Sequence, residues 1–594
     1  MARLAILLHE DAPGKEQKLL AQILDFFGVP WKNVGLSEFT DSKEQFGEHA
    51  LFGSVQTLAA ALKQVGEGQA SSRCVACFAY ASQDRAASEF GLQSLCEDSA
   101  VSLRDAPSGV VPVRVSTEPT DITGLMAGLE FRSPLRMEDA VLANTETPEK
   151  KFVTIISVAG APAFVSFHFN TVPVYFSASS YIVDINQQTG PGFYDVKEHF
   201  LSAVPLVLAI RHIFREVAWQ PQELGACLIF DDPLLRERYG CCDFELLERL
   251  MQQYGFTTNI AFIPWNWHRT SRPAGKRFDH HKGRFSISIH GCDHINAEFG
   301  DSSPVVLNSR ASEAQWRMEK HETRTGIKHD RVMVFPQGIF SSACPGILKS
   351  NGYLAAVNTE IAPVDSDFAA TTIRDVWDVA IMRYGDFPVF TRRYAHHGLE
   401  NFAFDLLLGK PCLIVAHHEF FRDQCSALIR LIEQLQTLQI KLSWRSLGDV
   451  VRRACRRRAS EPGTEEFQMY ANELVIQNDS DKAIRAIVRR KEAHAESVAE
   501  VTFDQMPVEW TVAENHVVFA EAVGAHNSRR FQVSYRKSAE RTQFKRPLSF
   551  KLSVTIRRIL SEFRDSYVAK RPFPALTPPI RMKARPKPIR NSAR

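Results

Sequence analysis

The stretch ACLIFDDP, residues 226–233, is an apolar run that ends in two adjacent aspartates. A short apolar run bounded by charge and a proline is typical of a buried strand in a parallel sheet. Asp231 and Asp232 come where such a strand leaves the sheet, a place where ordinary strand design puts a polar turn but not two like charges. The pair marks a candidate site, although an isolated Asp-Asp is more often a helix cap or a solvated turn.

Similar runs recur along residues 221–455 and alternate with helical segments. The runs are ACLIF, TTNIAFI, FSISIH, VMVF, YLAAV and CLIVAHH. Each ends in a loop that contains charged residues, histidine or proline. Repeated strand-loop-helix units with reactive side chains at the carboxyl ends of the strands are the pattern of a β/α barrel. The sequence therefore predicts an α/β protein whose catalytic candidate is a (β/α) barrel.

The remaining segments predict smaller units. Apolar strands near 3–8 and 74–80 alternate with helices, which indicates an N-terminal α/β domain of the Rossmann-like kind. Short strand-like runs after the arginine-rich stretch 451–458 indicate a small C-terminal β-sandwich. The expected boundaries are 1–145 for the N-terminal domain, 146–220 for a β-rich connecting segment and helix, 221–455 for the barrel, 461–540 for the sandwich, and 541–594 for a helix and a disordered basic, proline-rich tail.

Length and charge restrict the class of protein. A chain of 594 residues is too long for one hydrophobic core, and 44% hydrophobic with 23% charged residues is an ordinary globular composition. The 71 basic and 68 acidic residues leave a net charge of +3, which gives no overall field for capturing nucleic acid. We expect no nucleic-acid partner.

Cysteine usage and the first residues favour a cytoplasmic location. The eleven cysteines are scattered and odd in number, which suits reduced thiols better than a disulfide framework. Cys74 and Cys77 form a CxxC in an extended run, where residues three apart face opposite sides, so we expect neither redox nor metal use of this pair. The opening MARLAILLHEDAPG is too short and too acidic for a signal peptide.

Histidines occupy two later strand ends of the barrel region. His290 and His294 stand in SISIHGCDH, and His417 and His418 follow CLIVA. One carboxylate with two imidazoles suits a divalent ion, zinc above all, and the H-x3-H spacing puts both rings on one side of a turn. Alone, an HxxxH is more often a surface pair, and a double histidine is often one buried and one solvated ring. Their joint occurrence at strand ends favours a metal site.

The barrel region resembles the polysaccharide deacetylase superfamily, also called the NodB-homology or carbohydrate esterase family four superfamily. That family carries TFDDG, H-[ST]-x-x-H, R-x-P-x-G and a late strand ending in histidine on a distorted β/α barrel, and here the stretches read IFDDP, HGCDH, VFPQG and LIVAHH. The resemblance covers residues 221–455. It implies a hydrolase of amide bonds, a metal-dependent carbohydrate de-N-acetylase or deacetylating esterase.

The resemblance also implies a role for each motif residue. Water activated by the metal would lose a proton to the base and attack an amide or ester carbonyl, and a histidine would protonate the leaving group. The implied roles are general base for Asp231, metal ligand for Asp232, His290 and His294, and general acid for His417, with His418 as the alternative.

Three positions depart from the family pattern. Pro233 follows the aspartate pair, Gly291 replaces Ser or Thr, and Val334 stands where the family has the arginine that tethers the base. Without that partner for the charged form of Asp231, the activity of the enzyme is expected to rise at a higher pH than in relatives that keep the arginine. The arginines that we consider as substitutes are Arg331, Arg374 and Arg383.

Two loops are candidates for contact with a carbohydrate substrate. Trp265 and Trp267 can stack on sugar rings, and covering the barrel end is an equally good explanation for them. The loop Pro336, Gln337 and Gly338 is the second candidate, with a backbone N–H near Gln337 as an oxyanion donor.

Two other functions remain open. One is a catalytically silent protein that keeps the metal pocket and binds carbohydrate or acts as a scaffold. The other is glycoside hydrolysis on a related barrel, using Asp231 with another carboxylate. Released acetate distinguishes the proposed activity from the first alternative, and a new reducing end identifies the second.

The segment 552–568 has apolar residues at helical spacing with arginines between them, and the basic tail follows it. Ile556, Ile559, Leu560 and Phe563 form the apolar stripe. We expect an ordinary packed helix. The alternative is a peripheral membrane or partner-docking element, because basic residues beside an apolar stripe favour anionic lipid.

Overall fold

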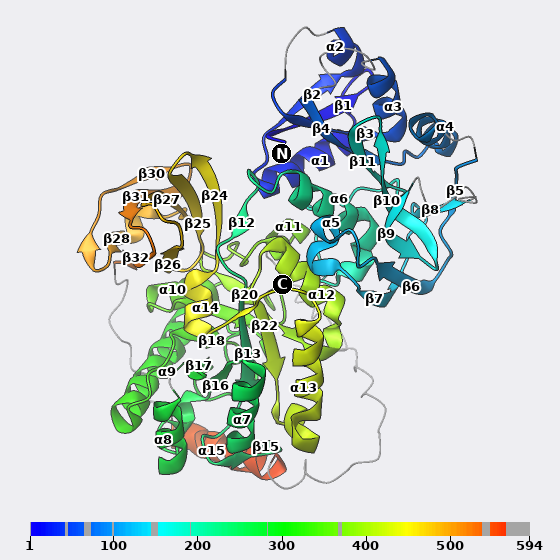
Figure 1. Cartoon of the computed structure of the whole chain (residues 1–594). Helices are drawn as coiled ribbons and strands as arrows, with labels where there is room; N and C mark the ends of the chain where they lie inside the picture. The colour runs from blue at the N-terminus through cyan, green and yellow to red at the C-terminus, as the bar shows by residue number, and fades with distance from the viewer. Residues whose placement is uncertain are drawn as a thin grey trace, which may run out of the picture.

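The computed structural model describes residues 2–41, 46–64, 73–97, 100–143, 152–190, 192–281, 283–365, 371–536 and 547–565. Figure 1 shows three β-rich units in these parts: the N-terminal sheet at the top, a pair of C-terminal sheets at the left, and a barrel below them. The barrel carries every residue for which the sequence predicts a role in catalysis, metal binding or substrate binding.

The barrel is a parallel sheet of eight strands in the order β20-β19-β18-β17-β16-β13-β22-β21, and β23 also pairs with β13. Only Arg392 separates the two edge strands β20 and β21 in the chain, so the edges lie together and the barrel nearly closes. The predicted β/α barrel is confirmed. Its strands are β13 Gly225–Asp231, β16 Thr258–Phe262, β17 Phe285–His290, β18 Val332–Val334, β19 Ala355–Asn358, β20 Val389–Thr391, β21 Arg393–Tyr394, β22 Cys412–Ala416 and β23 Ser443–Trp444.

Helices cover the outside of the barrel, and local sequence sets their ends. Asp243 caps the first of them by accepting hydrogen bonds from the backbone N–H groups of Glu245 and Leu246, and Gly255 ends it at a left-handed φ of 76°. The helices are α7 Phe244–Tyr254, α8 Arg272–His280, α9 Pro304–Thr325, α10 Cys344–Ser350, α11 Ile373–Trp377, α12 Leu399–Leu408, α13 Arg422–Gln436 and α14 Leu447–Arg453; the hairpin β14 Arg238–Tyr239 and β15 Cys242–Asp243 precedes α7.

The N-terminal unit is a nine-stranded sheet in the order β2-β1-β3-β4-β11-β10-β9-β6-β7. Strands β1 to β4 and β11 are parallel, and the rest are antiparallel. Buried residues of α1 and α6 pack on one face of the sheet, and those of α3 and α4 on the other.

The sheet runs through the boundary that was expected at residue 145. Strand β11 pairs with β4, so the connecting segment 146–220 supplies three strands to this same sheet. The strands of the unit are β1 Leu4–His9, β2 Trp31–Gly35, β3 His49–Ser54, β4 Cys74–Tyr80, β5 Ser102–Asp105, β6 Val110–Val115, β7 Glu130–Pro134, β8 Ala140–Ala143, β9 Val153–Val158, β10 Ala161–Phe169 and β11 Val172–Ser177. Its helices are α1 Lys15–Phe27, α2 Leu36–Asp41, α3 Val55–Gln64, α4 Arg85–Cys96, α5 Thr120–Thr123 and α6 Phe200–Ile213.

Cys74 and Cys77 lie closer together than an unbroken strand allows. The register between β3 and β4 shifts here, since His49 pairs with Cys74 and Ala50 with Ala76, which leaves Val75 as an extra residue. The two Sγ atoms are 3.9 Å apart. The prediction that these side chains face opposite sides is wrong, because it assumed a regular strand.

The C-terminal unit consists of two sheets with a shared core that includes Phe467, Val488, Leu474 and Phe531. Strand β12, which precedes the barrel in the chain, joins the first sheet by pairing with β24. One sheet contains β12 Gln220–Pro221, β24 Cys455–Glu461, β25 Thr464–Met469, β27 Ile484–Lys491, β31 His516–Val523 and β30 Trp510–Ala513; the other contains β26 Glu473–Asn478, β32 Asn527–Tyr535, β28 Val498–Phe503 and β29 Met506–Pro507.

A last helix, α15 Leu548–Phe563, lies at the lower end of the barrel in Figure 1. The basic tail 566–594, which the sequence predicts to be disordered, lies outside the described residues. No helix in the described ranges combines the length and the apolar character that crossing a bilayer requires.

Candidate functional site

Asp231 and Asp232 end strand β13 and turn to different partners. Asp231 is the last residue of the strand, and Asp232 takes a left-handed backbone conformation with a φ of 75°. Such a φ is uncommon outside glycine and breaks the regular alternation of side chains. Asp231 meets Arg392, whereas Asp232 meets His290 and His294. The backbone turn is what allows two adjacent carboxylates to serve two separate contacts.

Asp232, His290 and His294 form a compact donor cluster. Their ligand atoms all lie within 4.8 Å of one another. The Nε2 atoms of His290 and His294 are 3.3 and 2.9 Å from Oδ1 of Asp232. Burial would raise the pKa of Asp232, but the two imidazoles lower it further, so the net pKa lies well below the usual value. The carboxylate is therefore ionised.

The cluster fits a divalent cation. Oδ1 of Asp232 is buried and has no hydrogen bond among the described residues, although two imidazoles face it. His290 uses Nδ1 to donate to the Val334 carbonyl at 2.8 Å, which leaves Nε2 with its lone pair toward the cluster. One carboxylate oxygen and two imidazole nitrogens are a donor set that zinc and similar ions accept.

The loop that carries His294 is held by Glu298, a residue that the sequence analysis missed. Its buried carboxylate accepts hydrogen bonds from the backbone N–H groups of Cys292, Asp293 and His294, at 2.9, 2.8 and 3.0 Å. Burial raises the pKa of Glu298 despite these donors. A glutamate a few residues beyond the HxxxH was the available signal, but nothing in its spacing distinguished it from a surface acid.

Gly291 makes room for this carboxylate. Its φ is 67°, and a Cβ atom there would lie 2.4 Å from Oε2 of Glu298 and 2.5 Å from Cγ of Pro336. A serine or threonine at this position therefore cannot coexist with Glu298 in its present place. Glu298 therefore organises the loop that carries His294, and Gly291 leaves the space that its carboxylate occupies.

Arg392 holds Asp231 in a bidentate ion pair. Nη1 and Nη2 lie 2.7 Å from Oδ1 and Oδ2, and both side chains are buried. Of the arginines considered from the sequence, Arg331 pairs with Glu473 at 3.3 Å and Arg383 with Asp375 at 3.2 Å. No contact between the described residues joins Arg374 to Asp231. The guanidinium that holds Asp231 comes from the junction of β20 and β21.

This ion pair overturns the expected effect on the base. Burial would raise the pKa of Asp231, but the charges of Arg392, His290 and His417 outweigh it, so the pKa lies below the usual aspartate value. The expectation that Asp231 lacks a partner and titrates at a higher pH is wrong.

His417 and His418 point to different places. Nε2 of His417 lies 3.9 Å from Oδ2 of Asp231, its side chain is 40% exposed, and its ring stacks on Tyr394. His418 is buried, and its Nε2 lies 3.5 Å from Oδ1 of Asp565, just beyond α15. Of the two, His417 is beside the candidate base.

The two loops that are candidates for contact with a substrate both pack against the loop that carries His294. Trp265 donates its backbone N–H to the Cys292 carbonyl at 3.0 Å, and the Arg269 guanidinium lies 5.3 Å from the centre of its ring. Trp267 is half-buried and lies against His268, with ring centres 5.3 Å apart.

The loop at Pro336 is tied to the same region through side chains and backbone. Oε1 of Gln337 accepts from the Ala297 N–H at 3.2 Å, and the Gly338 carbonyl accepts from Nδ2 of Asn358 at 2.9 Å. Pro336 lies against Gly291. Both loops therefore border the loop that carries His294.

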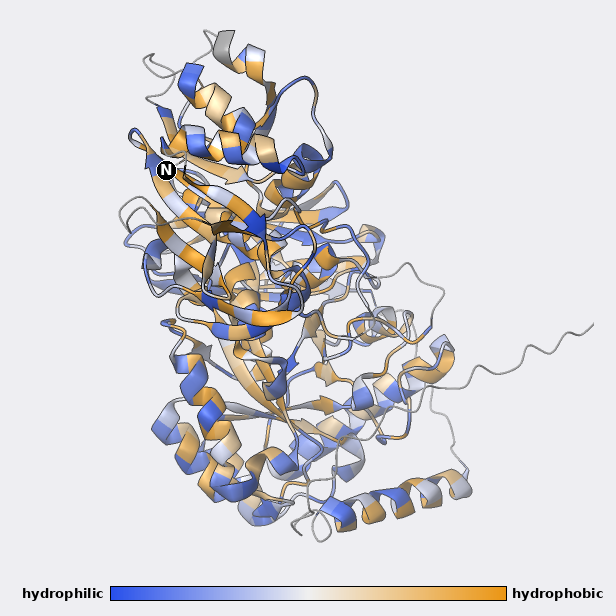
Figure 2. Ribbon diagram, turned by 90° about the vertical axis from the view of Figure 1, so that its right-hand side faces the viewer, coloured by the Kyte–Doolittle hydropathy of each residue, from blue (hydrophilic) through white to orange (hydrophobic). Residues whose placement is uncertain are grey.

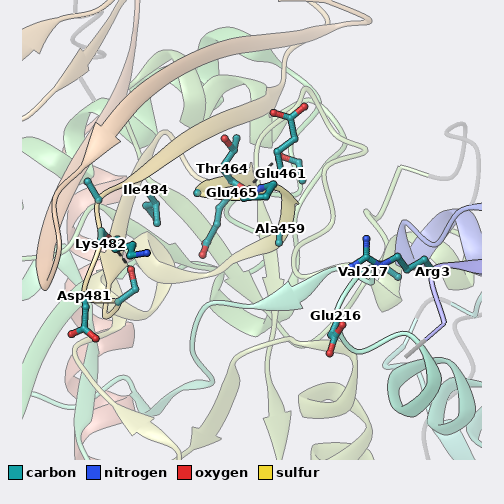
Figure 3. Close-up of a pocket in the computed structure, with 15 residues that line it drawn as sticks. Arg3, Glu216, Val217, Ala459, Glu461, Thr464, Glu465, Asp481, Lys482 and Ile484 are labelled. Atoms are coloured by element: carbon teal, nitrogen blue, oxygen red, sulfur yellow. Dashed lines mark hydrogen bonds between the residues drawn. The ribbon is translucent and has the colours of Figure 1, made fainter. Parts of the chain in front are cut away.

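An open cavity of about 680 Å³ lies away from this site (Figure 3). Arg3 and Glu216 line one side, and two turns of the C-terminal unit, with Glu461 and Lys482, line the other. None of the predicted catalytic, metal or substrate residues lines it. The acidic and basic residues that line this cavity do not form a recognisable catalytic or metal-binding group.

Comparison with known proteins gives similarity only among solved structures. No protein-family model and no curated protein matches the chain. Similar structures include a family 4 carbohydrate esterase from Bacillus anthracis (12% identity, 40% of this chain and 86% of that chain, TM-score 0.22), the Streptomyces lividans family 4 carbohydrate esterase in complex with acetate (12%, 36% and 88%, 0.23), and a family 4 acetyl xylan esterase from Clostridium thermocellum in complex with a cobalt ion (14%, 38% and 89%, 0.23). Because the identities and TM-scores are this low, the functions of these proteins cannot be assigned to this chain.

Proposed function

We propose that this protein is a metal-dependent carbohydrate deacetylase that hydrolyses an N-acetyl amide or an acetyl ester. The observation that carries the proposal is that two neighbouring carboxylates contact different sets of side chains. Asp231 is fixed by Arg392 beside His417, and Asp232 joins His290 and His294 in a cluster that fits a divalent ion. Acetyl hydrolysis needs this combination of a base, an acid and an electrophile in one place.

In this proposal each residue has one task. Asp232, His290 and His294 hold the cation, for which zinc is the expected identity. When bound, the cation polarises a carbonyl and lowers the pKa of water. Asp231 takes the proton from the attacking water, and its low pKa keeps it ionised at neutral pH. His417, which is partly exposed, delivers a proton to the leaving nitrogen or oxygen.

The site supports the alternative functions less well. Glycoside hydrolysis needs a carboxylic acid whose pKa is raised so that it can donate a proton. The pKa values of Asp231 and Asp232 are both lowered, so neither suits that role. The pKa of the nearby Glu298 is raised, but both of its carboxylate oxygens already accept hydrogen bonds from backbone N–H groups. The non-catalytic alternative rests on the missing arginine at Val334, and Arg392 supplies that guanidinium.

The test is a metal assay followed by acetate release. Purified protein should hold about one divalent ion per chain. Metal-loaded protein should release acetate from acetylated chitin oligosaccharides or acetylated xylan. Metal without acetate release from any acetylated sugar would favour the non-catalytic alternative, and new reducing ends would favour a glycosidase.

Variants of the aspartate pair separate the two tasks. Asp232→Ala should lose both metal and activity. Asp231→Asn preserves shape but cannot accept the proton, so it should keep the metal and lose turnover by about a hundred- to ten-thousand-fold. Undiminished acetate release by Asp231→Asn would refute the assignment of the base.

A further inference from the structure

Helix α15 turns its apolar residues away from the protein. Leu548, Leu552, Ile556, Ile559 and Leu560 are 83%, 62%, 50%, 54% and 62% exposed. Their spacing of three or four residues puts them on one side of the helix, here called the outer face. Figure 2 shows α15 along the lower edge of the molecule, with orange apolar positions alternating with blue polar ones. The sequence expectation of an ordinary packed helix is wrong for this stripe.

The opposite side of the helix docks on the barrel through polar groups. Val554 and Arg558 are 4% and 3% exposed. Glu562 receives Nη2 of Arg269 at 2.9 Å, and Asp565 accepts from the Tyr239 hydroxyl at 2.8 Å. A helix that buries an arginine and exposes leucine and isoleucine has the reverse of the usual arrangement. The docking contacts therefore fix α15 in a pose that leaves its outer face available to a second surface.

Charge identifies the kind of surface. Residues 541–594 contain 15 of the 71 Lys and Arg residues but only two of the 68 Asp and Glu residues, so residues 1–540 carry a net charge of −10. The positive charge of the chain is thus concentrated on both sides of α15 in the sequence. At 100° per residue, Arg557 and Arg564 border the outer face. An apolar face with basic residues beside it matches the interface of an anionic bilayer.

We propose that α15 is a membrane-surface helix whose outer face enters the headgroup region of an anionic bilayer. The inner side of the helix lies near the candidate site, because Glu562 pairs with Arg269, whose guanidinium lies over the ring of Trp265. A bilayer bound to the outer face would therefore be separated from the Trp265 loop by α15 itself. The membrane contact does not depend on deacetylation and can be tested without a substrate.

The experiment is sedimentation of the full chain with vesicles of phosphatidylcholine alone or mixed with phosphatidylglycerol. Binding to the anionic vesicles alone, weakened by added salt, is the expected result. The double variant Leu552→Asp with Ile556→Asp places acids on the outer face and should lower binding by about tenfold or more. The matched control is Met506→Asp with Val512→Asp, which changes two residues of the C-terminal unit that are 68% and 54% exposed and should bind as wild type.

Circular dichroism and metal content of both variants should equal those of wild type, since neither pair is buried. Three outcomes would overturn the proposal. They are no binding of wild type to anionic vesicles, wild-type binding by the outer-face variant, and a wild-type dimer without vesicle affinity that the outer-face variant dissociates. The last outcome would assign the outer face to a second copy of the chain.

Discussion

Arg392 joins the two edges of the barrel sheet and also binds Asp231 through the two terminal nitrogens of its guanidinium, each at 2.7 Å. It is the one residue between β20 and β21, whose strands lie at opposite ends of the strand order. Closure of the barrel and placement of the candidate base therefore depend on the same position. A change in how the barrel closes would move the base.

Replacing Arg392 by methionine should shift the acid limb of the activity profile to higher pH. In the wild type, burial raises the pKa of Asp231, and the charges of Arg392, His290 and His417 together outweigh it. Without Arg392 the largest of these opposing charges is lost, so Asp231 is protonated at a higher pH and the base is lost there. The measurement is kcat against pH for acetate release. An unchanged acid limb in a folded variant would contradict the role of Arg392.

Arg393→Met is the control for the stability of that variant. Arg393 is the next residue and forms a similar buried pair with Asp405, at 2.6 and 3.0 Å. Breaking either pair should lower the free energy of unfolding by about 3–5 kcal/mol, because a buried charge is left alone. Denaturant unfolding should show comparable losses, while only Arg392→Met moves the pH profile.

Metal content should depend on His294 and not on a fully buried histidine elsewhere. His294→Gln removes one of the three ligands of the cluster, so the purified protein should lose its divalent ion. His321 is fully buried beside Thr270, with Nε2 2.8 Å from the hydroxyl, and His321→Gln should keep the ion. Metal analysis after dialysis makes the comparison. If both variants retain the same number of divalent ions per chain, the ion is bound at another site.

The sequence predicted the barrel and the aspartate and histidine positions because strand periodicity and motif spacing are local. Arg392 could not be found in this way, since its contact with Asp231 spans 161 residues and follows from barrel closure. The same holds for α15, whose apolar stripe is visible in the sequence but whose outward direction depends on the polar contacts of Glu562 and Asp565 with the barrel. The prediction that Cys74 and Cys77 face opposite sides was wrong because of a one-residue bulge, which the alternation of residues in the sequence does not reveal.

The adjacent histidines should separate in kinetics. His417→Gln removes the imidazole that lies 3.9 Å from Asp231, and acid catalysis of this kind contributes about a hundred- to ten-thousand-fold. His418→Gln removes a contact with Asp565 and should leave kcat near wild type. Both variants should keep the metal, which makes kcat the informative quantity. A larger loss in His418→Gln would reverse the assignment of the acid.

Glu298 and Gly291 should behave as a coupled pair. Glu298→Ala removes the acceptor of three backbone N–H groups, which loosens the loop of His294 and should weaken metal affinity by about ten- to a hundredfold. Gly291→Ser drives a Cβ into the Glu298 carboxylate and should also weaken it. In Gly291→Ser with Glu298→Ala that clash is gone, so the loss of metal affinity should be smaller than the sum of the two single losses.

Zinc titration against a competing chelator measures the three affinities, with Glu313→Gln on α9 as the control for a lost carboxylate nearby. Strictly additive losses would show that Glu298 does not occupy the space that Gly291 leaves.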